Sequence, residues 1–452
     1  MGNNKILLIG GGVVVLFIIG LIIFFVSRGN GGGGIITNKG PKIINIWTTT
    51  DNKKALDPIL NKFQDKNSNV KINYVVKNAD TFLEDSINEI AAGNGPDLWV
   101  IPNDWLPQYS DKLVSMNETV LADSKKHLSG LEVYKQKFPQ VISSGTIINN
   151  KIIGIPLTID TLTLYYNPSL FSKVNTEIYQ SQKVISEKEK SVLYGQINNW
   201  DDFVKAVQLI TKKNGNKIER SAAAIGTADN ISQSTDILTL LMMQNGAKMV
   251  SDDLKSAQFQ TDQNQFSDIK FPGVKALEFY NSFSDPKSNN YTWNSEIEDS
   301  VRAFVEGKTA MIFDYPSVDK KIKLIDPKFE YSSITMPQLK ETENIVNLAK
   351  FPVLTVTKAS KNPDIAWDLI LYLTTDSENL NTFQNVSGEN IAYGSVKDSI
   401  KTAKTWYKPD PKKSDEIFKE MIRQANKGLD IPTAVQGAAS QITTLLGKIN
   451  QN

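Results

Sequence analysis

Short apolar runs alternate with helical patterns from residue 42 onward, and this alternation limits the possible folds more than any other feature. Residues 42–47 form a strand pattern, and the apolar positions of 56–63 recur at helical spacing. A second strand pattern over 70–76, a second helix over 82–90 and a third strand over 97–101 follow. Strands that alternate with helices predict parallel βαβ units in an α/β domain.

The loops that follow two of these strands carry polar and aromatic side chains. Asp51 lies after the first strand, and Asp104 and Trp105 lie after the third. Ligands of open α/β sheets bind at the carboxyl ends of the strands. Carboxylates accept hydrogen bonds from the donors of a ligand, and a flat ring can cover an apolar face of a ligand. Capping a helix or forming a turn is the alternative role of the two aspartates.

The run from Gly154 to Asn167 is predicted to be a buried strand that joins two parts of the fold. Its composition is β-branched and apolar, but Asp160 interrupts it. A carboxylate in an apolar strand is costly unless it is paired. Asp160 is therefore either a turn residue at an edge or an acceptor that a hinge strand offers to a ligand. Residues 331–336 are interpreted as a second crossing strand.

Further candidates follow predicted strands in the second half of the chain. Asp229 comes after the small-residue strand 222–226, and Asp314 and Tyr315 end the strand 309–313. Trp293 lies among polar neighbours, so its ring is a further candidate for contact with a ligand. The candidate ligand-binding set is Asp51, Asp104, Trp105, Asp160, Asp229, Trp293, Asp314 and Tyr315.

Composition excludes several classes of function. A chain of 452 residues suits two or three domains, and 40% hydrophobic residues describe an ordinary folded protein. The formal net charge of +1 gives no general attraction to nucleic acid. Cysteine is absent and His127 is the single histidine, which removes disulfides, thiolate catalysis and histidine-cluster metal sites. We therefore expect neither a metal nor a cofactor.

Residues 6–26 are uncharged and largely apolar, a length that spans a bilayer. No small-residue cleavage pattern follows, which favours an uncleaved anchor over residues 1–28 instead of a cleaved signal peptide. The glycine-rich residues 29–41 predict a flexible linker. The positive charges on the two sides of residues 6–26 weakly disfavour export of the rest of the chain. Large domains can be translocated regardless of such charges.

Segments along the chain resemble, in the same order, the extracellular solute-binding proteins of ABC importers, the family that includes maltose-binding protein. The segments are Ile44–Asp51, Ala91–Trp99, Gly154–Asn167, Ala303–Ile312 and Asn362–Trp367. The resemblance covers about residues 42–450. Each segment alone is a weak match, and their shared order makes the resemblance strong.

The resemblance implies a bilobed, type II periplasmic-binding-protein-like fold with two α/β lobes joined by hinge crossings. Residues 42–159 and 337–376 would form lobe I, and residues 160–336 and 377–452 would form lobe II. The lobes would close on a small solute, and an ABC permease in the membrane would receive it. Such a protein is a binder and not an enzyme. Its body would be extracellular, and residues 6–26 would replace the lipidated cysteine used by relatives.

The resemblance also carries ligand positions to this chain. Asp51, Asp104 and Asp160 match acids of the maltose-binding branch. Asn52, Trp105 and Ser317 replace a lysine, an arginine and a stacking tryptophan of that branch, which counts against maltodextrin itself. A sugar or oligosaccharide is the expected solute. The alternatives are a peptide or polyamine and, further from the pattern, a tethered glycoside hydrolase that uses two carboxylates.

Overall fold

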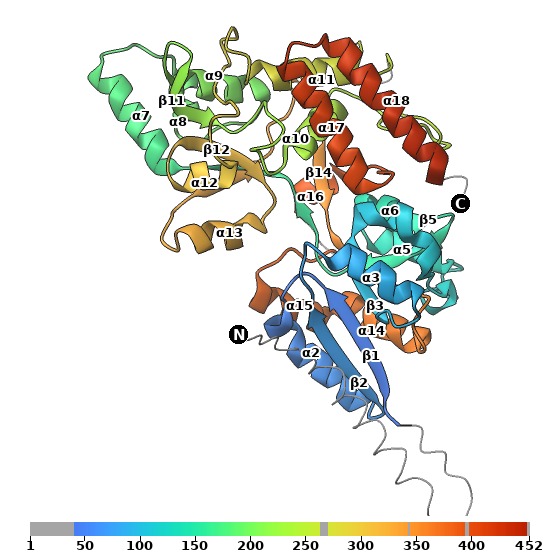
Figure 1. Ribbon diagram of the computed structural model, residues 1–452. Helices are drawn as coiled ribbons and strands as arrows, with labels where there is room; N and C mark the ends of the chain where they lie inside the picture. Colours follow the sequence, from blue (N-terminus) through green and yellow to red (C-terminus); the bar gives the residue numbers. More distant parts are fainter. Residues whose placement is uncertain (1–39, 263–269, 342–343, 394–396, 450–452) are drawn as a thin grey trace, which may run out of the picture. The chain divides into compact units, whose positions relative to one another are not determined.

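The computed structural model describes residues 40–262, 270–341, 344–393 and 397–449 (Figure 1). The described residues from 43 onward belong to one compact unit. The predicted anchor over residues 1–28 and nearly all of the linker lie outside the described residues. Among the described helices, none combines the length and the apolar character that crossing a bilayer requires.

The first sheet contains the predicted βαβ units. Its strands, in spatial order, are β2 (Val70–Val76), β1 (Lys42–Thr48), β3 (Leu98–Pro102), β15 (Pro352–Thr357) and β4 (Leu113–Val114), with β7 (Gly154–Pro156) also paired to β15. β1 and β3 are parallel, as the alternation predicts, whereas β15 runs antiparallel to β3, β4 and β7. The strand that arrives last in the sequence therefore lies in the middle of this sheet.

Helices pack around the first sheet and enclose the first core. They are α2 (Lys53–Lys66), α3 (Phe82–Ala91), α4 (Leu106–Tyr109), α5 (Gly130–Lys137), α6 (Gln140–Thr146), α14 (Pro363–Thr375), α15 (Ser377–Ser387) and α16 (Asp398–Lys401), and a hairpin of β5 (Ile147–Ile148) and β6 (Lys151–Ile152) lies beside them. In α2 the residues at helical spacing, among them Leu56, Ile59 and Phe63, face inward. Trp99 and Val353 are completely buried in this core.

The second sheet has the order β10 (Lys212–Asn214), β11 (Lys217–Ala223), β12 (Thr309–Asp314), β9 (Thr163–Tyr166) and β13 (Ser332–Thr335). The surrounding helices are α7 (Pro168–Gln180), α8 (Glu187–Leu193), α9 (Trp200–Ile210), α10 (Ser234–Gln244), α11 (Pro272–Ser282), α12 (Ser300–Val305), α13 (Val318–Ile325), α17 (Pro411–Asn426) and α18 (Ile431–Ile449). Phe203, Met311 and Ile442 are completely buried in this second core. The described residues thus pack into two hydrophobic cores, each with its own sheet.

A small sheet lies where the chain passes between the two cores. It consists of β16 (Ala403–Lys404), β14 (Asn347–Lys350) and β8 (Asp160–Thr161). Across β8 the buried residues change from the first core at Ile159 to the second core at Leu162. β14 leads back from Leu348 in the second core to Phe351 in the first. Because the crossing strands pair with one another, the passages lie side by side.

The structure corrects the predicted boundaries after residue 160. The run from Gly154 to Asn167 is not one strand, because β7, β8 and β9 join three different sheets. Residues 331–336 do not cross between the cores, since β13 pairs with β9 in the second sheet. Residues 377–403 were assigned to lobe II, but Leu380, Phe383 and Ile400 pack into the first core. The assignment was based on their position in the sequence. That position does not reveal that α15 packs against α2, a helix of the first core.

Candidate functional site

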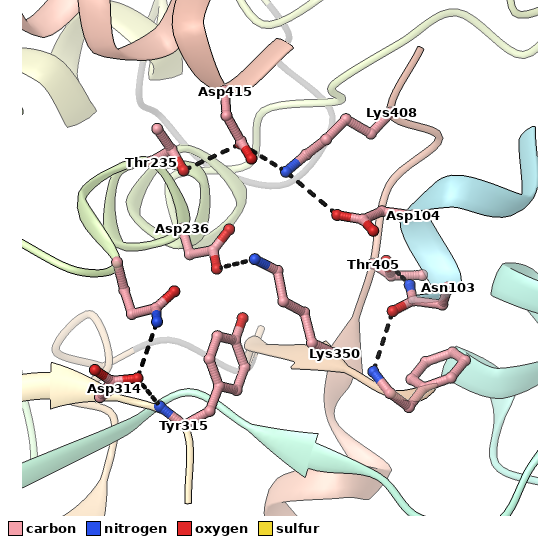
Figure 2. A network of polar contacts seen from close by, with 12 residues as sticks. Asn103, Asp104, Thr235, Asp236, Asp314, Tyr315, Lys350, Thr405, Lys408 and Asp415 are labelled. Atoms are coloured by element: carbon pink, nitrogen blue, oxygen red, sulfur yellow. Dashed lines mark hydrogen bonds and ion pairs between the residues drawn. The ribbon is translucent and has the colours of Figure 1, made fainter. Parts of the chain in front are cut away.

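Charged side chains from both cores meet beside the crossing strands (Figure 2). Asp104 lies in the helical turn η1 (Asn103–Trp105) after β3, and Asp236 lies in the first turn of α10. The polar network, as we call it, consists of Asp104, Asp236, Asp314, Lys350, Lys408 and Asp415. Its members come from strand ends, helix starts and the connection between β16 and α17, which are positions with unpaired backbone groups and room for polar side chains.

Lys408 connects the two cores within the polar network. Its Nζ lies 2.8 Å from Oδ1 of Asp415 and 3.6 Å from Oδ2 of Asp104, and its side chain is only 4% exposed. Asp104 follows a strand of the first sheet, whereas Asp415 belongs to α17, which packs into the second core. Burial disfavours the ammonium, but Asp104 and Asp415 outweigh it and raise the pKa of Lys408. Lys408 therefore stays charged and holds a carboxylate on each side.

Lys350 forms a further ion pair of the polar network. Its Nζ lies 2.5 Å from Oδ2 of Asp236, whose side chain is 4% exposed. The same ammonium lies 5.5 Å from the centroid of the Tyr315 ring, within the range of a cation–π contact. Burial would raise the pKa of Asp236, but Lys350 and Lys408 together lower it. Asp236 thus remains a charged carboxylate although it is buried, like the rest of α10.

Asp314 has a different environment, because no lysine among the described residues forms an ion pair with it. Its Oδ1 accepts hydrogen bonds from Nε2 of Gln233 at 2.9 Å and from the backbone N–H of Tyr315 at 2.7 Å. Oδ2 is buried and has no hydrogen-bond partner among the described residues. Burial raises the pKa of Asp314 to about 6. Asp104 likewise keeps one buried oxygen, Oδ1, without such a partner in the described chain. Both oxygens are acceptors that a ligand donor could satisfy.

Asn103 fixes the loop of Asp104 against the crossings. Its Nδ2 donates to Oγ1 of Thr405 at 2.9 Å, and its Oδ1 accepts from the backbone N–H of Phe351 at 3.1 Å. Thr405 follows β16, and Phe351 joins β14 to β15. The end of β3 is thereby tied to the segments that follow β16 and β14.

A cavity of about 1420 Å³ adjoins the polar network through Asn103 and Thr405. We call it the inter-core cavity, because residues that pack with the first core and residues that pack with the second both line it. Figure 1 shows α6 and β5 near the ends of α17 and α18, the elements that contribute its opposite walls. The rings of Tyr109, Trp406 and Tyr407, all half-buried, form part of the lining.

The structure brings together part of the predicted site. Asp104, Asp314 and Tyr315 meet in or beside the polar network (Figure 2). Asp160 lies opposite Lys350 in the register of β8 and β14, and burial together with Glu389 raises its pKa to about 6. Trp105 is half-buried and packs against the first core, with its ring centroid 6.4 Å from that of Trp99. These placements do not test contact with a ligand, which stays a prediction.

The remaining predicted residues lie elsewhere. Asp51 is exposed and accepts a hydrogen bond from the backbone N–H of Lys53 at the start of α2. Asp229 is 64% exposed and pairs with Arg423 of α17, with 2.6 Å between the closest atoms. Trp293 is completely buried in the second core. Its indole N–H donates a hydrogen bond to Oδ1 of Asn230.

Sequence reasoning missed Asp236, Lys350, Lys408 and Asp415. One of them carries a local signal, because Lys350 lies between the buried Ala349 and Phe351, just as Asp160 interrupts an apolar run. Nothing in the sequence near Lys408 indicates that it is buried, since its partners come from η1 and α17.

Comparison with known proteins decides the family. Residues 47–379 match the family of bacterial extracellular solute-binding proteins. The chain belongs to this family. The solute-binding protein is 22% identical over 352 residues to the multiple sugar-binding protein of Streptococcus mutans, a match that covers 76% of this chain and 74% of the relative. It is 23% identical over 353 residues to the maltodextrin-binding protein of Bacillus subtilis, over 75% of this chain and 71% of the relative.

The fold of the solute-binding protein is also found among solved structures. The cyclic alpha-maltosyl-1,6-maltose binding protein from Arthrobacter globiformis superposes with a TM-score of 0.70 at 17% identity, over 90% of this chain and 100% of that chain. At this identity the likeness shows the fold alone. It confirms the predicted bilobed α/β fold, and the family match confirms the predicted resemblance.

Proposed function

We propose that this solute-binding protein captures a sugar or an oligosaccharide between its lobes and delivers it to an ABC permease. The inter-core cavity is the observation that carries this proposal. Its volume of about 1420 Å³ exceeds the roughly 300–1,000 Å³ typical of small-molecule sites, so it has room for more than one sugar ring. Tyr109, Trp406 and Tyr407 supply rings for the apolar faces of a sugar. Relatives named for sugars support the same class of solute.

Binding would be coupled to movement of the lobes. A ligand that touches both lobes only when they are closed stabilises the closed arrangement. Closure would change the distances within the polar network, because Asp104 and Asp415 come from the two cores and share Lys408. The permease would then recognise the closed arrangement, and no bond of the solute would be broken.

Thermal unfolding of the full-length protein with a panel of mono- and oligosaccharides tests this proposal. A sugar present at about 100 times its Kd adds roughly 2.7 kcal/mol of stability. Trp406→Ala removes a ring from the cavity and should shrink that gain, whereas Trp47→Ala, at a half-buried ring outside the cavity, should preserve it. Unchanged melting with every sugar would refute sugar capture, and released products would indicate an enzyme.

We further propose that residues 6–26 hold the protein at the cell membrane with its body on the outside. The uncharged, apolar sequence of this run supports an anchor, and the extracellular character of the family supports export. The full chain should sediment with membranes after an alkaline carbonate wash, and a chain that begins at residue 29 should not. Protease added to intact cells should cleave the body. Release of the full chain by carbonate, or protection of its body from protease, would contradict the proposal.

A further inference from the structure

The walls of the inter-core cavity carry an excess of positive charge. Among the described residues, the ionisable side chains in its lining, apart from tyrosine, are Lys112, Lys151, Lys358, Lys413, Lys448, Asp111 and Asp410. The chain as a whole has a formal net charge of only +1. The excess at the cavity is therefore local and does not reflect a generally basic protein.

The two aspartates of the cavity are already paired within it. Asp111 lies 2.9 Å from Nζ of Lys112, and Asp410 pairs with Lys413 and also caps α17. Their charges are thus balanced by neighbours on the same wall. The positive charge that remains comes from the other three lysines.

Lys151, Lys358 and Lys448 are exposed, and no acidic group of the described chain lies within ion-pair distance of them. Lys151 belongs to the β5–β6 hairpin, Lys358 follows β15, and Lys448 lies near the end of α18. Separate parts of the chain, from both sides of the cavity, therefore contribute lysines to its lining. Flexible, exposed ammonium groups serve as point charges for carboxylate, sulfate or phosphate.

We propose that the solute is an acidic saccharide, a sugar or oligosaccharide that carries carboxylate, sulfate or phosphate groups. This inference rests on the proposed function and narrows its class of substrate. The rings of Trp406 and Tyr407 contact the apolar faces of the sugar, and the three lysines attract and pair with its anionic groups. The lysines lie toward the solvent, so they act first on the rate of association.

Matched pairs of sugars test the proposal, because each pair differs mainly in charge. Two pairs are oligomers: galactose oligomers with galacturonic acid oligomers, and glucose oligomers with glucuronic acid oligomers. Two further pairs compare glucose with glucose 6-phosphate and glucose with glucose 6-sulfate. Binding to the purified full-length protein is measured by calorimetry in 50 mM and 500 mM NaCl. We expect an acidic member to bind roughly tenfold more tightly than its neutral counterpart at low salt, and this preference to shrink at high salt.

Variants assign the effect to the cavity. Lys151→Gln and Lys358→Gln should each lower the preference for the acidic member roughly threefold by removing one positive charge. Lys320→Gln removes the same charge from an exposed position on α13, outside the cavity lining, and should change nothing. Melting temperatures measured without sugar confirm that all three variants fold.

The outcomes separate this inference from the proposed function. Equal or tighter binding of the neutral members would overturn the acidic class while sugar capture stands. A preference that Lys320→Gln reduces as much as Lys151→Gln and Lys358→Gln would overturn the role of the cavity. Absence of binding by every probe would refute both the inference and the proposed function.

Discussion

The polar network and the inter-core cavity adjoin each other at Asn103 and Thr405, yet they hold lysines in opposite ways. Lys408 is almost completely buried between two carboxylates, whereas Lys448 is exposed and pairs with no acid in the described chain. An unpaired buried charge is very costly, but an exposed one costs little. The comparison indicates that the buried Lys408 fixes the arrangement of the cores, whereas the exposed lysines of the cavity remain available to a solute.

The largest effect is expected when Lys408 is replaced by Met. The substitution leaves Asp104 and Asp415 without their shared cation, and breaking a buried pair from one side costs about 3–5 kcal/mol. Because Asp415 is 37% exposed, we expect a loss at the lower end, about 3 kcal/mol. Urea unfolding of the full-length protein measures it.

Lys448→Met is the matched control for this prediction. It removes the same charge from the exposed wall of the cavity and should change the free energy of unfolding by less than about 0.5 kcal/mol. Similar losses in the two variants would show that the two regions do not differ as we describe.

A smaller effect, with the opposite sign, is expected for Asp314→Asn. The folded protein holds the proton of Asp314 more tightly than the unfolded chain, because its pKa is raised to about 6 from roughly 3.9. The stability it contributes is therefore complete below about pH 4 and is lost as the pH rises through about 6. Removing the charge should stabilise the protein by about 1–2 kcal/mol at pH 7 and by almost nothing at pH 4.

Unfolding at a series of pH values measures the gain from Asp314→Asn. Asp51→Asn, at an exposed carboxylate, should show no gain at either pH. A loss of stability at pH 7 in the Asp314 variant would mean that this carboxylate is required in its charged form.

The smallest effect is expected for Asp410→Ala in the wall of the cavity. Asp410 caps α17, since its Oδ1 accepts from the backbone N–H of Lys413 at 3.2 Å, and loss of such a cap costs about 1 kcal/mol. Its backbone has a φ of +39°, which Asn tolerates better than Ala. Thermal melting should therefore show a loss for Asp410→Ala and almost none for Asp410→Asn. Equal losses would exclude the cap as the cause.

Local sequence patterns predict the elements of this protein better than their partners. The strands over 42–47 and 97–101 and the two helices between them were predicted correctly, because their periodicity lies within each segment. The run from Gly154 to Asn167 was assigned to one strand, although Ile155 pairs with Leu354 and Leu164 pairs with Phe313. Sheet membership depends on strands distant in the sequence, and a local pattern does not contain that information.

The same reasoning applies to the site. Asp104 and Asp314 could be singled out because each lies at the end of an apolar strand. Lys408 could not, since its burial depends on the simultaneous approach of η1 and α17. Trp293 was selected for the polar residues beside it in the sequence, but Asn230, 63 residues away, accepts the hydrogen bond of its indole N–H inside the core.

The central position of β15 determines the order in which the newly made chain can fold. Every strand of the second sheet lies between residues 163 and 335, whereas the first sheet lacks its middle strand until residue 357 has been made. The first sheet, whose first strand is made before any strand of the second, is therefore completed after it, and the edge of β3 remains open to wrong pairing during synthesis. A chain that ends at residue 340 lacks β15, so residues 42–159 should be open to cleavage by protease.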